Sequence, residues 1–386
     1  MSEHEHLHDH PHEHPAGPKR AWHLRGVILD GDGAGQAGPR DLWVADGQVA
    51  EGPVAGAEHL AEDVWVLPGL VDAHCHIGVQ AAPGGGAQPA SPALQETQAI
   101  TDRDGGTLLI RDAGSPANTT WIDQRDDLPH LIRAGRHIAR TRRYIKGLGV
   151  EVEPEELVAE VTRQARHSQG WIKLVGDWID RSVGDLAPCW PAEVAAQAIA
   201  QAHELGCRVT AHCFGEQAVA EMVAAGIDCI EHGTGLTPPV ITEMAARGTA
   251  LVPTCINLEN FPHYADQGEA RFPAYAAHMR HLYATHKDVL GAARDAGVAI
   301  YCGTDAGTVI PHGQAGQEVV RLGEIGGADF ALGAATWRAR PWLGRPSLEV
   351  GAPADFVVYR ADPRQDLQVV THPWYVMLGG RLVYQS

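Results

Sequence analysis

The stretch Leu67–Gly78, LPGLVDAHCHIG, decides how the rest of the chain is interpreted. Apolar residues typical of a buried strand run through Asp72 to His74, Cys75 and His76, and the run stops at a glycine. Alternate side chains of a strand share a face, so His74 and His76 point the same way while Cys75 points to the other side. Two adjacent imidazoles provide half of a metal site, and Cys75 is expected to pack as a small apolar residue. An isolated His-x-His pair is equally compatible with two structural histidines, so the remaining sequence has to decide.

From residue 68 onward, strand-like runs alternate with helical runs, which indicates parallel βα units. After the opening strand, further strands are expected at 105–114, 136–145, 171–176, 207–213, 227–235, 249–256 and 298–307. Eight βα units in a row predict an α/β fold of the (β/α)8 TIM-barrel class over residues 68–343.

The two ends of the chain have β character instead. Residues 21–67 and 344–386 contain short strand-like runs separated by turn pairs such as Asp46-Gly47 and Gly379-Gly380. Each end is too small to be stable alone, so we expect the two to pair into one β-sandwich domain beside the barrel. The G-x-G-x-x-G run at 33–38 is followed by another strand rather than a helix, so no nucleotide cofactor is expected.

Residues 1–20 alternate six histidines with mostly acidic residues and prolines. Such a segment cannot bury a core and is predicted to be disordered. Loose binding of transition metals and the absence of any role are both compatible with this composition.

Composition excludes several classes of partner. The formal net charge of −18 disfavours nucleic acid and anionic membrane surfaces, because both would repel the protein. No apolar run approaches the roughly 20 residues of a membrane span, and the polar N-terminus favours a cytoplasmic location. Seven cysteines without a C-x-x-C pair suit a reducing compartment. We therefore expect a small-molecule substrate as partner, with a homo-oligomer left open.

In a TIM barrel the active site lies at the C-terminal ends of the strands, so polar residues at those ends are the informative ones. Four histidines, one lysine and one aspartate occupy them: His74, His76, Lys173, His212, His232 and Asp305. Imidazole and carboxylate ligands in this mixture suit zinc or a similar divalent ion.

The segments that carry these residues resemble the signature positions of the amidohydrolase superfamily. PGLVDAHCHIG, WIKLVG, TAHCFG, CIEHGTG and CGTDAG occur in that order between about residues 68 and 310, and LEVGAPADFVVY resembles the returning β-domain. Within the superfamily the chain is most similar to imidazolonepropionase-like proteins and cytoplasmic Xaa-Pro dipeptidases.

This resemblance implies a dinuclear centre that hydrolyses an amide bond. One divalent ion, expected to be Zn²⁺, would be bound by His74, His76 and Asp305, and a second by His212 and His232. Lys173 would be N6-carboxylated and would bridge the two ions. A bridging hydroxide would attack the substrate carbonyl, with Asp305 and His232 as the catalytic residues. The substrates implied are dipeptides of the Xaa-Pro type and N-acyl amino acids.

Three alternatives remain. A cyclic-amide hydrolase or deaminase of the imidazolonepropionase type is one, although such members usually bind one metal and lack the lysine. A lactonase is another, because the same hydroxide attacks esters. A non-catalytic barrel is the third, but no ligand position is missing.

Residues near the pocket bear on the substrate. Arg140, Arg142, Arg143 and Tyr144 lie near the end of the third expected strand, and an arginine there could clamp a substrate carboxylate or simply pair with surface acids. Trp178 and Phe214 are further candidate contacts. Phe214 and the segment 176–181 depart from the pattern of Xaa-Pro dipeptidases. The glycine-rich loop at 83–89 is either a lid or a surface loop.

Overall fold

The structure of the chain is a computed structural model that describes residues 20–34 and 38–386. Residues 1–19 of the expected histidine-rich tail lie outside the described residues. Among the residues described, no helix has both the length and the apolar character that a membrane crossing requires.

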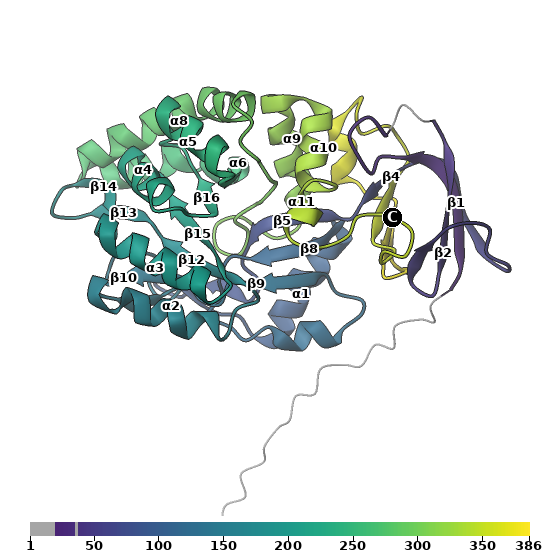
Figure 1. The fold of residues 1–386 in the computed structure, drawn as a ribbon, viewed down its shortest axis with the longest axis horizontal. Helices are drawn as coiled ribbons and strands as arrows, with labels where there is room; N and C mark the ends of the chain where they lie inside the picture. Colours follow the sequence, from purple (N-terminus) through teal and green to yellow (C-terminus); the bar gives the residue numbers. More distant parts are fainter. Residues whose placement is uncertain (1–19, 35–37) are drawn as a thin grey trace, which may run out of the picture.

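Parallel strands form the centre of the larger part of the molecule (Figure 1). One sheet has the order β5 (Leu70–Cys75), β8 (Thr107–Asp112) and β9 (His130–Arg133). A second sheet has the order β11 (Val150–Val152), β10 (Ile138–Arg140), β12 (Trp171–Val175), β15 (Arg208–Cys213), β16 (Cys229–His232) and β17 (Ala250–Val252). Every residue of β5, β8, β12 and β16 is buried, as expected for parallel strands covered on both faces.

Residues 299–302 connect the two sheets, although they form no regular strand. Leu251 N–H donates to Ala299 O at 2.8 Å, and Ala73 N–H donates to Cys302 O at 2.8 Å. This segment therefore lies between β17 and β5, where the eighth strand is expected. Closure of a complete eight-stranded barrel stays a prediction.

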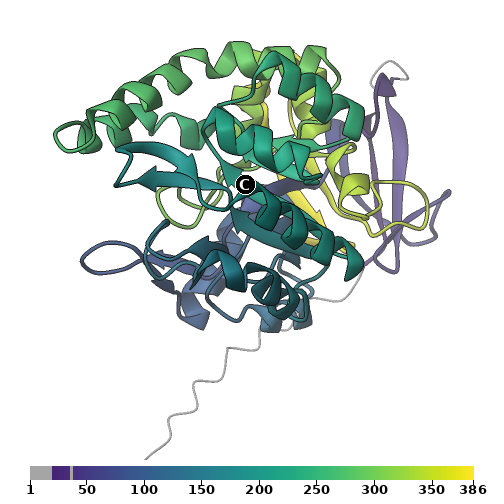
Figure 2. The same ribbon diagram turned by 60° about the vertical axis from the view of Figure 1, so that its left-hand side comes forward.

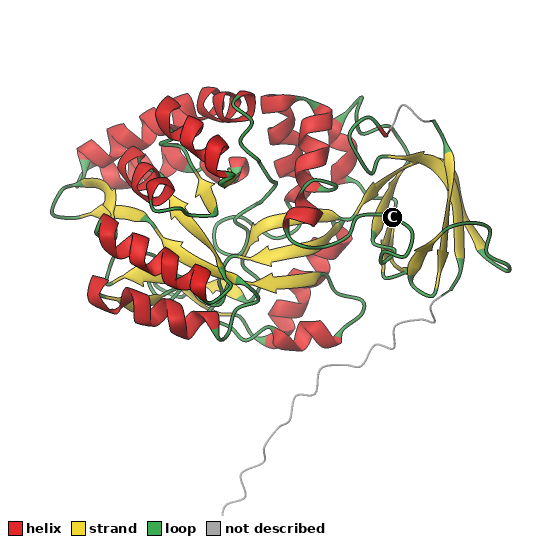
Figure 3. Cartoon of the chain, viewed as in Figure 1, coloured by secondary structure: helices red, strands yellow, loops and turns green. Residues whose placement is uncertain are grey.

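Helices surround these strands (Figure 3). They are α1 (Pro92–Asp104), α2 (Leu157–Ala165), α3 (Ala192–Glu204), α4 (Glu216–Ala224), α5 (Pro238–Arg247), α6 (Cys255–Leu258), α7 (Phe261–Glu269), α8 (Pro273–Asp295), α9 (Ala315–Gly326), α10 (Ala328–Ala335) and α11 (Ala339–Trp342). Helix α3 shows why they form: Ala195, Ala198, Ile199 and Ala202 recur at helical spacing, and all four are buried.

The two ends of the chain share one seven-stranded sheet, whose purple and yellow strands lie together at the right of Figure 1. Its order is β20 (Arg381–Gln385), β19 (Tyr375–Leu378), β18 (Phe356–Tyr359), β4 (Glu58–Pro68), β1 (Trp22–Ile28), β2 (Arg40–Ala45) and β3 (Gln48–Ala50). The long strand β4 pairs with β1 on one edge and with β18 on the other. The ends therefore combine as expected.

This sheet differs from the two facing layers that the sequence analysis predicts. At its far edge, β3 returns to the segment before β18, where Val49 N–H donates to Ala352 O at 2.9 Å. The sheet thus curves around a single apolar cluster that includes Leu24, Val66 and Phe356.

The third expected strand is also corrected. Of residues 136–145 only β10 is extended, and β9 precedes it in the sheet beside β8. The backbone turns after Arg140, and Arg142 has a left-handed φ of 61°. The glycine-rich loop joins a hairpin of β6 (Val79–Ala81) and β7 (Ala87–Pro89). A second hairpin, β13 (Asp177–Asp180) with β14 (Asp185–Pro188), projects beside helix α8 (Figure 2).

Candidate metal centre

Strand β5 places His74 and His76 side by side, as its period-two pattern predicts. Both residues are about 1% exposed, and their Nε2 atoms lie 3.1 Å apart. The Nδ1 atom of His76 lies 2.9 Å from Gly114 O, and that carbonyl can only accept a hydrogen bond. The proton of the neutral ring is therefore on Nδ1, and Nε2 keeps a lone pair for a metal.

Asp305 lies against both imidazoles. Its Oδ1 atom is 3.1 Å from His74 Nε2 and 3.0 Å from His76 Nε2, while Oδ2 accepts a hydrogen bond from Asn257 Nδ2 at 2.7 Å. Burial acts to raise the pKa of Asp305, but the neighbouring His74 and His76 outweigh it and hold that pKa well below its usual value. The group is therefore a carboxylate near neutral pH.

His212 and His232 form the second half of the cluster. His212 Nδ1 lies 3.0 Å from His232 Nε2, and His232 Nδ1 lies 2.6 Å from Thr254 Oγ1. His232, Thr254 and Asp305 all have left-handed backbone conformations, with φ of 67°, 50° and 62°. Such strain in residues other than glycine persists only where the surrounding structure enforces it, and it concentrates at functional sites.

Lys173 is fully buried on β12, where its Nζ atom contacts the Oε2 atom of Glu231. Glu231 is itself fully buried and accepts hydrogen bonds from Thr210 Oγ1 at 2.8 Å and from Arg111 Nη2 at 3.3 Å. Its Oε2 atom also lies 3.4 Å from His74 Nδ1. Glu231 therefore links Lys173 to the first histidine.

Glu231 is not among the candidate residues identified from the sequence, where only His232 of this strand is singled out. In a regular strand, Glu231 and His232 would face opposite sides, but the left-handed φ of His232 ends the regular strand. Both residues consequently lie near His74. An acidic residue inside the otherwise apolar strand sequence CIEH is the signal that could have identified it.

The donor atoms have the spacing that a metal ion requires. An ion with ligand bonds of about 2.0–2.2 Å in tetrahedral geometry separates its ligand atoms by roughly 3.3 Å. The three distances among His74 Nε2, His76 Nε2 and Asp305 Oδ1 are 3.1, 3.1 and 3.0 Å. Donor atoms of His74, His232 and Asp305 also lie within 4.8 Å of one another. The residues present fit a divalent metal.

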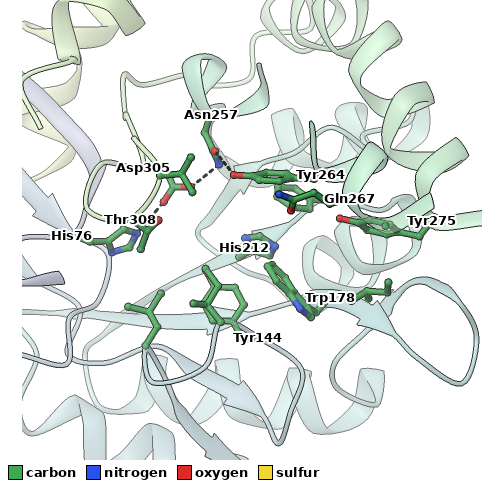
Figure 4. Close-up of a pocket in the computed structure, with 16 residues that line it drawn as sticks. His76, Tyr144, Trp178, His212, Asn257, Tyr264, Gln267, Tyr275, Asp305 and Thr308 are labelled. Carbon is green, nitrogen blue, oxygen red and sulfur yellow. Dashed lines mark hydrogen bonds and ion pairs between the residues drawn. The ribbon is translucent and has the colours of Figure 1, made fainter. Parts of the chain in front are cut away.

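A cavity of about 380 Å³ opens above this cluster (Figure 4). Tyr144, Trp178 and Phe214, which the sequence analysis singles out, all line it. The lining also includes residues from loops and from α6, α7 and α8 that are not predicted from the sequence: Leu148, Asn257, Tyr264, Gln267, Tyr275, Thr308 and Val309.

The three candidate arginines do not line this cavity. Arg143 pairs with Asp180 at 2.6 Å and donates to the carbonyl oxygens of Trp178 and Ala187. Arg140 lies 3.5 Å from Cys189 O, and Arg142 is exposed on the turn after β10. The turn after Arg140 carries these side chains away from the site, so the expected clamp for a carboxylate is not found there.

Cys75 faces away from the histidines, as expected, but its surroundings are not purely apolar. Its Sγ atom lies 3.8 Å from Asp102 Oδ2 and 3.7 Å from His312 Nδ1, and the latter two atoms are 2.8 Å apart. Burial raises the pKa of the Cys75 thiol well above its usual value. The neutral thiol packs behind the candidate metal site against an ion pair between α1 and the loop after Asp305.

Comparison with known proteins places this site in a family. The model of the amidohydrolase family matches residues 65–383. The chain belongs to the amidohydrolase family. Amidohydrolases generally bind divalent metals, in agreement with the donor atoms described above. Family membership supports a hydrolase.

Similar proteins exist in mycobacteria and among solved structures. Uncharacterized proteins of Mycobacterium tuberculosis and Mycobacterium bovis are each 53% identical over 363 residues, covering 93% of this chain and 95% of theirs. A Xaa-Pro dipeptidase with bound methionine has a TM-score of 0.78 at 23% identity, covering 95% of this chain and 100% of its own. A putative prolidase from Bifidobacterium longum gives 0.79 at 23%, covering 95% of each chain. These likenesses imply a TIM-barrel-type fold.

Proposed function

We propose that this amidohydrolase is a metal-dependent enzyme that cleaves a C–N amide bond in a small substrate. The observation that carries the proposal is the cluster of His74, His76, His212, His232 and Asp305 at the floor of one cavity. The substrates implied by the sequence are dipeptides of the Xaa-Pro type and N-acyl amino acids.

In this proposal His74, His76 and Asp305 hold one ion, expected to be Zn²⁺, and His212 and His232 hold a second. Lys173, as an N6-carboxylated residue, would supply anionic oxygens to both. Burial lowers the pKa of Lys173 to about 7, which favours the uncharged amine that reacts with carbon dioxide. The ions, when bound, would polarise the amide carbonyl and lower the pKa of water.

The protein residues orient groups and move protons. Asp305, held by Asn257, takes a proton from the attacking water and passes it to the leaving nitrogen. His232, fixed by Thr254 through Nδ1, keeps Nε2 directed toward His212. The water oxygen joins the carbonyl carbon, the C–N bond breaks, and the products are a carboxylic acid and an amine.

The proposal includes the domain division expected from the sequence. Residues 68–343 would form the closed barrel that carries every candidate ligand, and residues 21–67 with 344–386 would form the accessory β-domain. The strand order and the hydrogen bonds through residues 299–302 support this division.

The first test is metal content. Elemental analysis of the purified protein should find about two divalent ions per chain, and Lys173→Ala should lose at least one. Lys146→Ala, at an exposed position, is the control and should keep both. A full complement of metal in Lys173→Ala would contradict the bridging role.

The second test is a screen of the metal-loaded protein against amides, dipeptides, N-acyl amino acids, cyclic amides and lactones. Release of an amine from linear amides would support the proposal. Turnover confined to cyclic amides or to lactones would replace it with the corresponding alternative.

A further inference from the structure

The wall of the cavity is built from aromatic rings. Tyr144 and Trp178 meet edge to face with ring centroids 4.9 Å apart, and Phe214 lies 4.2 Å from the His212 ring. Tyr264 and Tyr275 continue this surface away from His76, as Figure 4 shows. Together these five rings form the aromatic wall. A wall of this kind binds an apolar or aromatic group through burial and ring packing.

The lining residues carry no positive side chain other than imidazole. Apart from the tyrosine phenols, the only acidic or basic side chains among them are those of Asp305, His76 and His212, and all three belong to the candidate metal cluster. Neither a lysine nor an arginine is part of the described lining.

A basic group that contacts the backbone of the wall, Arg143, is already paired. The Arg143 guanidinium donates to Asp180 at 2.6 Å, to Trp178 O at 2.9 Å and to Ala187 O at 2.8 Å. Redirecting it toward a ligand would leave the Asp180 carboxylate and two carbonyl oxygens without this donor. Arg143 therefore stabilises the β13–β14 hairpin and does not serve the cavity.

The polar groups along the wall suit a neutral ligand. Burial raises the pKa of Tyr275 to about 12, and it also raises the pKa of Tyr264 above its usual value. These phenols stay protonated at neutral pH. A carboxylate on the aromatic wall, away from the ions proposed for the floor, would lose hydration without gaining a lysine or arginine partner, which is unfavourable.

We propose that the substrate is an uncharged amide that carries an aromatic ring, with the ring on the aromatic wall and the amide carbonyl at Asp305. This inference rests on the proposed function. It disfavours dipeptides and N-acyl amino acids, because each brings a carboxylate close to the scissile bond.

Matched pairs of amides test this inference on the full, zinc-loaded protein. One pair carries the ring on the amine side: N-acetyl-2-phenylethylamine and N-acetyl-phenylalanine. The other carries it on the acyl side: N-methyl-phenylacetamide and phenylacetylglycine. Within each pair the two compounds differ only by a carboxylate. We expect kcat/KM to be at least about tenfold higher for the neutral member of the pair that is cleaved.

The outcomes distinguish a failure of the neutral-substrate inference from a failure of the proposed amide hydrolysis. Equal rates within a pair, or a preference for the acid, would overturn the neutral-substrate inference and leave amide hydrolysis standing. Absence of turnover for all four compounds and for every linear amide of the screen would overturn both.

A charge-gain variant provides a second test. Gln267 lines the cavity from the exposed face of α7, so Gln267→Lys adds a cation without disturbing the core. The ratio of kcat/KM for acid over neutral amide should rise by at least about fivefold. Gln267→Met, which adds no charge, is the control and should not shift this ratio. An unchanged ratio in Gln267→Lys would show that missing positive charge does not set the preference.

Discussion

The candidate metal cluster at the base of the cavity, called the floor here, and the aromatic wall consist of different kinds of residue. The floor consists of buried ionisable groups at strand ends, with contacts of 3.0–3.1 Å and left-handed backbone at His232 and Asp305. The wall consists of buried and partly buried aromatic rings from a hairpin, from loops and from helices α7 and α8. A rigid floor holds donor atoms where charge develops, whereas the wall contacts the parts of a substrate that do not react. Substitutions in the floor should therefore change kcat, and substitutions in the wall should mainly change KM.

The largest expected effect is on kcat, and it comes from a substitution in the floor. Asp305→Asn keeps the size of the side chain but removes the proton acceptor, so kcat should fall by at least about 100-fold with little change in KM. Steady-state kinetics on a cleaved amide, with metal content measured in parallel, gives the result. Asp329→Asn, on the exposed side of α10, is the matched control and should behave like the wild type. A kcat within tenfold of wild type in Asp305→Asn would mean that the floor does not carry the proton transfer.

A smaller effect, on KM, is expected from a substitution in the wall. Trp178→Leu removes the ring that meets Tyr144 edge to face, so KM for a neutral aromatic amide should rise about tenfold. The kcat value should change by less than about threefold. Trp43→Leu, on β2 of the terminal sheet, removes an indole far from the cavity and serves as control. If Trp178→Leu lowered kcat and left KM unchanged, the claim that the wall acts mainly on KM and the floor on kcat would be wrong.

The floor was more accessible to sequence reasoning than the wall, for a physical reason. Period-two alternation in β5 places His74 and His76 on one face, and the ends of parallel strands bring His212 and Asp305 to the same edge. These are properties of regular backbone. Glu231 was not predicted because it lies before the end of its strand, and only the residues at the strand ends were considered.

The wall combines side chains from separate elements, and no local sequence pattern predicts that these elements meet. Tyr264 and Tyr275 lie far along the chain from Tyr144, and only tertiary packing brings them to one cavity. The three candidate arginines do not line the cavity, because the chain turns at Arg142 instead of continuing the expected strand. Pairing of the two chain ends was predictable, because neither end could bury its apolar face alone. The curvature of the single sheet that they form was not predictable from the sequence.

The smallest expected effect is on the pH dependence of stability, and it comes from Glu318, a buried residue that packs behind the floor. Glu318 of α9 is fully buried and accepts hydrogen bonds from the backbone N–H groups of Cys255 and Ile256, directly after the Thr254 that holds His232. Burial raises the pKa of Glu318 from 4.5 to about 8. Between these two values the folded protein holds a proton that the unfolded chain releases. Stability is therefore favoured at low pH and falls as the pH rises toward 8, by at most about 1.4 kcal/mol per pH unit from this group.

Glu318→Gln removes this titration, so melting temperatures measured from pH 5 to pH 8 should fall less steeply with pH in the variant than in the wild type. Other buried carboxyls, such as Asp72 with a pKa raised by burial to about 7, contribute to both proteins and cancel in the comparison. Glu193→Gln, on the exposed face of α3, should run parallel to the wild type. Parallel curves for Glu318→Gln as well would show that Glu318 is already ionised in the fold. The floor would then be supported from α9 by a buried carboxylate rather than by a neutral carboxyl group.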